Sequence, residues 1–141
     1  MPSPVIVDAS YTLRMLLPNS IQPRLLKQMD IRQENNVPLY APTLWHYEVT
    51  TTLAKLVHCR EITEEASDKL LEMAFALDIS IIAPDESLCR HALHWTFRLK
   101  RASAYDCFYV ALAELLRGEL WTADRKLFRA VGQDWIRYAG T

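Results

Sequence analysis

The apolar residues of this chain fall into two kinds of segment. Short, continuous apolar runs bounded by proline or polar residues are typical of buried β-strands, and they predict strands at residues 4–7, 39–41, 79–83, 120–122 and 135–137. Longer segments repeat apolar residues every three or four positions, as one face of an α-helix does. They predict helices at residues 9–17, 21–32, 42–59, 63–77, 85–99, 104–117 and 124–131.

Residues at the ends of the predicted helices support these boundaries. Pro42 suits the first turn of a helix, where a missing backbone N–H costs nothing. Asp85 and Asp124 are good N-cap residues, because an aspartate oxygen accepts a hydrogen bond from the first turn. Gly118 is the residue type that most often ends a helix in the left-handed conformation.

Strands and helices alternate along the chain, and the strand segments do not alternate between apolar and polar residues. This pattern is typical of a parallel sheet covered on both faces. We therefore expect an α/β fold, a three-layer α/β/α sandwich with a central, mainly parallel sheet, in a single domain over residues 1–141. In such sheets, functional residues gather where the strands end at their carboxyl edge.

The composition excludes several classes of protein. Half of the 141 residues are hydrophobic and 23% are charged, which is a globular balance. The net charge of −1 excludes a highly basic nucleic-acid coat protein but leaves room for a local basic patch. All three glycines lie after residue 117, so the chain has no glycine-rich phosphate-binding loop.

The cysteines and the apolar runs exclude further classes. The three cysteines form no CxxC pair, which argues against a zinc ribbon or a disulfide framework, and we expect small buried side chains at Cys59, Cys89 and Cys107. The longest apolar runs are far shorter than the roughly 18 residues of a membrane-spanning helix. Residues 1–10 lack the pattern of a secretory signal, so we expect a cytoplasmic protein without a membrane span.

Four acidic residues lack an oppositely charged partner at helical spacing. Asp8 and Asp124 follow predicted strands, whereas Glu48 and Asp106 lie within apolar helical segments. An unpaired carboxylate in a buried stretch is costly, so each position needs an explanation. Asp8 and Asp124 could be N-caps, and Asp106 could be an acid favoured by the helix dipole. Glu48 escapes this interpretation because it lies about two turns into its helix, whereas Asp85, which also follows a strand, is better explained as a cap.

Considered together, the four acids predict a metal site. Asp8, Asp106 and Asp124 should stand at the same carboxyl edge of the sheet, where crowded carboxylates raise one another's pKa values. A divalent cation relieves that repulsion. An all-oxygen site without a nearby histidine or thiolate favours Mg²⁺ or Mn²⁺ over zinc. Such a cluster is suited to metal-assisted hydrolysis of phosphodiesters.

The segments that carry these acids resemble the PIN-domain family of metal-dependent ribonucleases. Within that family the chain is most similar to the VapC toxins of bacterial and archaeal type II toxin–antitoxin pairs. The similar segments are VIVDAS, YEVTTTL, SAYDCFYVALAE and LWTADRKL, in that order. With the alternation of strands and helices, the resemblance covers nearly the whole chain.

The resemblance implies a function and roles for individual residues. In the family, the acids that match Asp8, Glu48, Asp106 and Asp124 hold one or two Mg²⁺ or Mn²⁺ ions. Ser10 and Thr122 match hydroxyl residues that support the metal site. The implied activity is a magnesium-dependent endoribonuclease that acts as a toxin. The implied partners are an RNA substrate, a second copy of the chain in a homodimer, and an antitoxin that blocks the site.

Basic residues near the predicted edge are candidates for binding RNA phosphates. They are Lys100, Arg101, Arg125 and Lys126, with Arg14 nearby. Solvated helix ends are an equally ordinary explanation for each of them. Other functions stay open at this point, namely a housekeeping PIN nuclease that processes RNA, a receiver-type signalling domain and a catalytically inactive binding module. The receiver would need an adjacent acidic pair after the first strand, where Asp8 stands alone.

Overall fold

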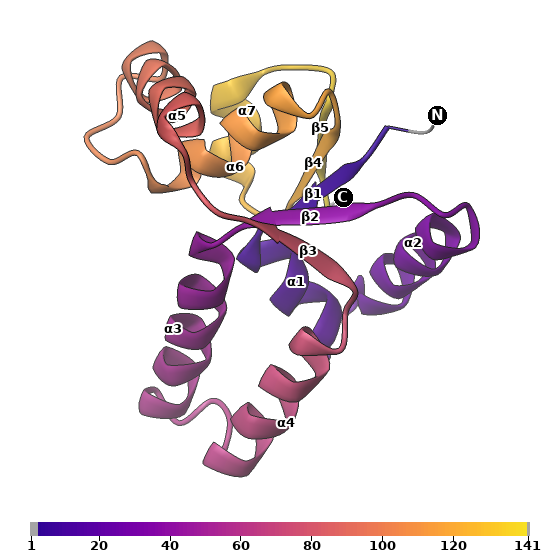
Figure 1. Cartoon of the computed structure of the whole chain (residues 1–141). Helices are drawn as coiled ribbons and strands as arrows, with labels where there is room; N and C mark the ends of the chain where they lie inside the picture. The colour runs from indigo at the N-terminus through magenta and orange to yellow at the C-terminus, as the bar shows by residue number, and fades with distance from the viewer. Residues whose placement is uncertain (1–2, 141) are drawn as a thin grey trace.

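The computed structural model describes residues 3–140 (Figure 1), so the ends of the predicted domain, residues 1–2 and 141, lie outside it. The strands are β1 (Val5–Val7), β2 (Leu39–Pro42), β3 (Ile79–Ile82), β4 (Glu119–Thr122) and β5 (Ile136–Tyr138). The helices are α1 (Ala9–Leu16), α2 (Gln22–Glu34), α3 (Leu44–His58), α4 (Glu64–Phe75), α5 (Glu86–Arg98), α6 (Tyr105–Leu115) and α7 (Arg125–Val131). Each predicted element occurs, and its ends lie within two residues of those expected.

The five strands form one parallel sheet in the order β3-β2-β1-β4-β5. The strand β1 is central, and its residue Val5 lies opposite Leu39 on one side and Glu119 on the other. All three residues of β1 are buried, which explains why its sequence is apolar without alternation. Because all strands run the same way, their carboxyl ends meet at one edge of the sheet.

Helices cover both faces of the sheet, which confirms the predicted three-layer α/β/α sandwich. In Figure 1, α5, α6 and α7 lie above the sheet, and α1 to α4 lie below it. The apolar helix α6 packs against β1, β2 and β4, and its residues Cys107, Val110 and Ala111 are fully buried there. Within the described residues, no helix is both long enough and apolar enough to cross a membrane.

Side-chain caps fix where several helices begin. Asp8, Thr63, Asp85 and Asp124 each accept a hydrogen bond from a backbone N–H in the first turn of the following helix. Such caps satisfy donors that have no partner within the helix, and each contributes about 1 kcal/mol. The predicted caps Asp85 and Asp124 are therefore confirmed as structural features.

Two local predictions are wrong. Pro42 does not begin a helix: it is the last residue of β2, and α3 starts at Leu44. A proline is tolerated at the end of a strand because the N–H that it lacks removes at most one hydrogen bond of the ladder there, and Pro42 is buried. Cys107 is buried as expected, but Cys59 and Cys89 are exposed, since one follows the last turn of α3 and the other lies on the outer face of α5.

The end of α6 also differs from the prediction in its mechanism. The left-handed residue is Arg117, with φ of 53°, and Gly118 donates its backbone N–H to Ala113. Gly118 is needed for a different reason. A Cβ atom at this position would lie 2.4 Å from the carbonyl oxygen of Pro4 and 2.9 Å from Cδ1 of Ile6. The absence of a side chain lets β4 approach the start of β1.

This close approach generates a prediction for stability. Gly118→Ala should lower the free energy of unfolding by about 1–3 kcal/mol, because the backbone of Pro4 must move to admit a methyl group. Gly132→Ala gives a comparison for backbone strain alone, since Gly132 has φ of 62°, where alanine costs about 1–2 kcal/mol, but only ordinary contacts around its Cβ position. Urea denaturation of both variants measures the effect. A loss well below about 1 kcal/mol at Gly118 would contradict the packing explanation.

Candidate active site

The four predicted acids line one cleft at the carboxyl edge of the sheet. Its volume is about 520 Å³, and its walls include Asp8, Glu48, Asp106 and Asp124. These residues come from four places in the chain: the end of β1, the second turn of α3, the first turn of α6 and the end of β4. We call this feature the carboxylate cleft. The parallel topology brings together side chains that are up to 116 positions apart in sequence.

Asp8 is buried at the base of the cleft, with 5% of its surface exposed. Its Oδ1 accepts hydrogen bonds from the Ser10 hydroxyl at 2.7 Å and from the backbone N–H of Tyr11 at 2.8 Å. Its Oδ2 accepts a hydrogen bond from the buried Thr122 hydroxyl at 2.5 Å. Three donors therefore replace the water that this carboxylate loses on burial.

The two hydroxyl residues also connect the ends of β1 and β4. Ser10 Oγ accepts a hydrogen bond from the backbone N–H of Ala123 at 2.9 Å. Thr122 Oγ1 accepts one from the backbone N–H of Asp124 at 3.0 Å. Each hydroxyl thus donates to Asp8 and accepts from the segment after β4. The structure places Ser10 and Thr122 where supporting residues of Asp8 would be needed.

Glu48 is held by a residue that the sequence interpretation missed. The hydroxyl of Tyr109 donates to Glu48 Oε1 at 2.6 Å, and the Tyr109 side chain is buried. Burial and the Glu48 charge both raise the pKa of the Tyr109 phenol, which keeps it protonated as a donor. A signal was available, since Tyr109 lies three residues after Asp106 and therefore on the same helical face.

Asp106 has a partner that helical spacing did not reveal. Its Oδ2 forms an ion pair with Nη1 of Arg101 at 2.9 Å, across the loop between α5 and α6. The two residues are five positions apart, whereas ion pairs within a helix join residues three or four positions apart. Both side chains are partly exposed, at 26% for Arg101 and 40% for Asp106. The pair therefore contributes little to stability, about 1 kcal/mol or less.

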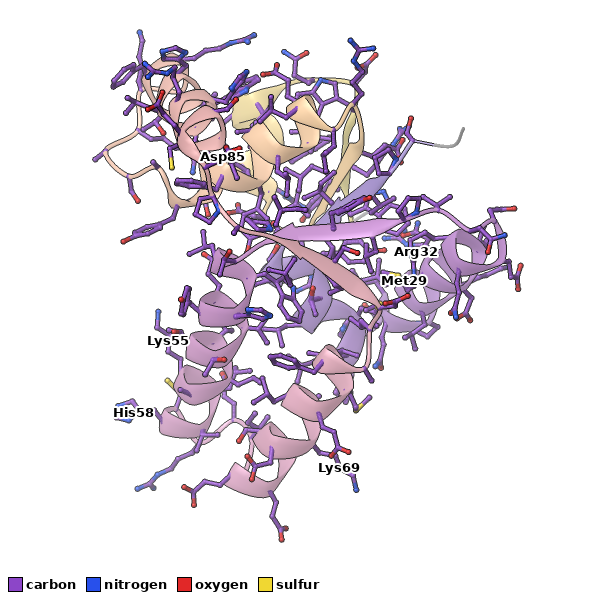
Figure 2. All side chains as sticks on the ribbon, in the orientation of Figure 1. Met29, Arg32, Lys55, His58, Lys69 and Asp85 are labelled. Atoms are coloured by element: carbon purple, nitrogen blue, oxygen red, sulfur yellow. The ribbon has the colours of Figure 1, made fainter. Side chains whose placement is uncertain are left out.

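Asp124 combines the two roles that the sequence left open. Its Oδ1 caps α7 by accepting from the backbone N–H of Leu127 at 3.1 Å, and its side chain also lines the carboxylate cleft. Asp8 does the same for α1. Asp85 caps α5 through Leu88 at 2.8 Å but does not line the cleft, and Figure 2 shows it at the start of that helix. A single aspartate can therefore cap a helix and also line the cleft.

The sequence and the fold agree on the family. A model described as PIN domain matches residues 6–135. The chain belongs to the PIN-domain family. No curated protein matches the sequence, so individual relatives come from solved structures.

Several solved structures share the fold of this PIN domain. PAE2754 from Pyrobaculum aerophilum has a TM-score of 0.72 at 20% identity, covering 99% of this chain and 92% of that one. VapBC2 from Rickettsia felis, bound to a DNA fragment from its promoter, has a TM-score of 0.72 at 12% identity, covering 95% and 97%. VapC20 from Mycobacterium tuberculosis, a sarcin–ricin loop cleaving toxin, has a TM-score of 0.66 at 15% identity, covering 94% and 98%.

Two acids of this PIN domain have raised pKa values. Burial raises the pKa of Asp8 to about 6, against the lowering effect of its three hydrogen bonds, and the charge of Glu48 adds the smallest contribution. Burial also raises the pKa of Glu48, with a smaller contribution from the Asp106 charge. Loss of water is thus the main cause, whereas the sequence suggested mutual repulsion.

The donor set of the cleft fits a hard divalent cation. All four acidic side chains offer oxygen, the ligand that Mg²⁺ and Mn²⁺ prefer. The contacts described above use one oxygen of Glu48, one of Asp106 and one of Asp124, which leaves the second oxygen of each for a cation. As the side chains stand, no three acids, histidines or cysteines of residues 3–140 converge tightly enough to enclose a metal ion. Binding would therefore draw the acids inward.

The predicted basic residues lie around the cleft more than in it. Arg14 lines the cleft, and Arg101 reaches it through its ion pair with Asp106. Arg125 and Lys126 are exposed in the first turn of α7, directly after Asp124. Lys100 is exposed in the loop before α6.

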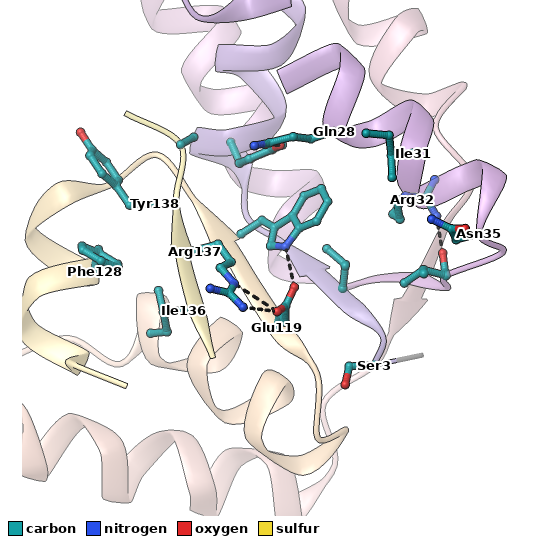
Figure 3. Close-up of a pocket in the computed structure, with 15 residues that line it drawn as sticks. Ser3, Gln28, Ile31, Arg32, Asn35, Glu119, Phe128, Ile136, Arg137 and Tyr138 are labelled. Atoms are coloured by element: carbon teal, nitrogen blue, oxygen red, sulfur yellow. Dashed lines mark hydrogen bonds and ion pairs between the residues drawn. The ribbon is translucent and has the colours of Figure 1, made fainter. Parts of the chain in front are cut away.

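A second hollow carries none of the predicted acids. It lies between α2 and the sheet, near the opposite ends of β1 and β4, and has a volume of about 620 Å³. Figure 3 shows that Glu119 at its wall pairs with Arg137, at 2.9 Å, and accepts from the Trp121 indole. This hollow shares no lining residue with the carboxylate cleft and is therefore a separate feature.

The raised pKa of Asp8 generates a prediction for stability against pH. The folded, metal-free state retains a proton at Asp8 up to about pH 6, whereas the unfolded state loses it near 3.8. The folded state therefore binds more protons between these values, and the Asp8 contribution to stability falls as pH rises through them. The difference between the two pKa values corresponds to about 3 kcal/mol of lost stability once the pH is above both.

Asp8→Asn should remove this pH-dependent penalty. Relative to wild type in EDTA, the variant should gain stability as pH rises from 4 to 7. Urea denaturation at several pH values measures this difference. Asp85→Asn, at an exposed cap, is the control and should show no such gain. A wild-type protein that gained stability over Asp8→Asn in this pH range would contradict the raised pKa.

Proposed function

We propose that this PIN domain is a Mg²⁺- or Mn²⁺-dependent endoribonuclease that cleaves RNA phosphodiesters. The observation that carries the proposal is the carboxylate cleft, where four acids from separate elements meet at the carboxyl edge of the sheet. Two of these acids hold their charge at a cost, because burial raises the pKa values of Asp8 and Glu48. A fold that retains such acids supports a role for them beyond stability.

Asp8, Glu48, Asp106 and Asp124 would hold the cation. When bound, Mg²⁺ or Mn²⁺ would supply activation of water and neutralisation of charge on the phosphate. The protein's own residues prepare this site. Ser10 and Thr122 donate to the two oxygens of Asp8, and Tyr109 donates to Glu48, so both acids are oriented before a cation binds.

Basic residues around the cleft would bind the RNA strand. Arg125 and Lys126 stand at the end of β4, and Lys100 and Arg101 stand before α6, so the two pairs flank the acids. Phosphate contacts from these residues would offset the repulsion between RNA and the acidic cleft. We infer that Arg14, which lines the cleft itself, joins them.

We also propose that the nuclease is the toxin of a toxin–antitoxin pair and acts in the cytoplasm. Solved structures of the same fold include a toxin–antitoxin complex from Klebsiella pneumoniae and VapBC-1 from nontypeable Haemophilus influenzae. An antitoxin partner would cover the carboxylate cleft and keep the enzyme inactive. A homodimer is supported by the outer face of α5, where Cys89, Leu93 and Phe97 form an exposed stripe at four-residue spacing.

The proposed site predicts the effect of one substitution on RNA cleavage. Asp106→Asn should reduce RNA cleavage at least about a hundredfold, because changes to groups that only support metal ligands already cost 10- to 100-fold. Its carboxylate caps no helix and is paired only with a partly exposed arginine, so the fold should persist. Cleavage of a labelled single-stranded RNA in Mg²⁺ and circular dichroism measure the two effects.

Asp85→Asn is the matched control, since it is the same change at an acid that caps α5 outside the cleft. It should cleave RNA at the wild-type rate, and EDTA should abolish wild-type cleavage. Equal losses at Asp85 and Asp106, or full cleavage in EDTA, would overturn the proposed site.

The second prediction concerns RNA binding. Replacing Arg125 and Lys126 by glutamine should weaken binding and flatten its dependence on salt, by about 0.7 in log–log slope for each lost contact with a single strand. Replacing Lys27 and Lys69, which are exposed on α2 and α4, removes the same charge far from α7 and is the control. Fluorescence anisotropy over a range of salt concentrations gives the slopes. An unchanged slope for the α7 pair would place the RNA elsewhere.

A further inference from the structure

A third hollow adjoins the carboxylate cleft along α3. It has a volume of about 790 Å³ and is lined by α3 and by the start of α6, with Pro42 and Pro84 at the strand ends. Glu48 and Thr52 line both this hollow and the carboxylate cleft. The two features therefore adjoin, with these two residues of α3 at their common border, and an RNA strand in the cleft would have the hollow beside it. We call this hollow beside α3 the aromatic hollow.

Three aromatic residues line this hollow. Tyr47 and Tyr105 line it with 65% of each residue exposed, and the half-buried Phe108, which packs against the core, lines it too. Each tyrosine directly precedes a cleft acid, since Tyr47 is followed by Glu48 and Tyr105 by Asp106. Both rings are mostly exposed, and neither belongs to the hydrophobic core or to the residues packed against it, so core packing does not explain them.

The hollow also contains polar groups that could bind the ribose and phosphate of a nucleotide. Lys55 lines it two turns further along α3 and points outward in Figure 2, while Thr51 and Thr52 supply hydroxyl groups. Flat apolar rings, hydroxyl groups and one cation match the parts of a nucleotide, namely a base face, base edges or ribose hydroxyls, and a phosphate. Proteins that bind single-stranded nucleic acids combine stacking rings with basic groups in this way.

We propose that the aromatic hollow is a nucleobase subsite, in which bases next to the scissile phosphate stack on Tyr47 and Tyr105. This inference rests on the proposed function and adds a substrate class to it. A base inside a duplex is stacked on both faces and cannot reach the tyrosines. The hollow therefore selects single-stranded RNA, and it positions a phosphate near Glu48 and Asp106 by holding the adjoining bases.

The test compares RNA binding by paired variants of the full chain. All proteins carry Asp106→Asn so that cleavage does not consume the probe, a labelled single-stranded RNA of mixed sequence. Tyr47→Ala with Tyr105→Ala should weaken binding at least about fivefold, which corresponds to about 1 kcal/mol for loss of stacking. Tyr47→Phe with Tyr105→Phe should bind like the parent, because the rings remain.

Two further measurements make the test specific. Phe75→Leu removes a ring of 57% exposure on α4, outside the hollow, keeps an apolar side chain against His46 and Trp45, and should leave binding unchanged. A probe with abasic nucleotides should bind the alanine variant and the parent equally. Equal binding of the mixed probe to both would overturn the inference. So would a loss of binding that accompanies dissociation of a dimer in sedimentation, since the hollow would then be an interface with a second copy.

Failure of the subsite and failure of the proposed function are distinguishable. Cleavage of RNA by the wild-type protein in Mg²⁺ tests the nuclease, whereas the binding comparison tests only the rings. A wild type that cleaves RNA while the alanine variant binds like the parent would retain the nuclease and remove the subsite. Preferential binding of duplex RNA by the parent would also remove it.

Discussion

One buried carboxylate constrains the centre of this structure. Asp8 lies at the end of the central strand with little access to water, so its charge depends on three protein donors. Two of those donors, Ser10 and Thr122, are themselves fixed by backbone N–H groups after β4. The position of Asp8 therefore determines how β1 and β4 end and where α1 begins. The carboxylate cleft is built around this point.

The same constraint explains why stability and chemistry share residues here. Asp8 and Asp124 each use one carboxylate to begin a helix and to line the cleft. An alanine at either position removes about 1 kcal/mol of helix capping together with a carboxylate of the cleft. Asp106 and Glu48 cap no helix, and their contacts with Arg101 and Tyr109 are made by side chains alone. These two acids therefore give the cleaner tests of function.

Much of the fold could be predicted from the sequence because its strands are buried on both faces. Continuous apolar runs such as Val5–Val7 and regular helical spacing identify the elements, and their alternation leads to a parallel sheet. Four acids could be selected because charge is costly in apolar segments. That they line one cleft follows from the topology, since strand ends meet at one edge.

Other features could not be predicted because they depend on contacts distant in sequence or across loops. Arg101 meets Asp106 through a loop whose path the pattern does not specify. Tyr109 reaches Glu48 across 61 positions, between α6 and α3. Proline is compatible both with the first turn of a helix and with the end of a strand, so the sequence did not determine which element contains Pro42. In the structure it is the last residue of β2. Exposure of Tyr47 and Tyr105 likewise depends on which neighbours cover each helix.

The ion pair between Arg101 and Asp106 would couple the binding of a cation in this cleft to the binding of a phosphate. A cation that takes Asp106 must compete with the guanidinium, and a phosphate that takes Arg101 must compete with the carboxylate. Each ligand thus releases the group that the other needs. By thermodynamic linkage, cation and RNA would increase each other's affinity by the same factor. Under the proposed function, metal and RNA would therefore bind more readily together than either one alone.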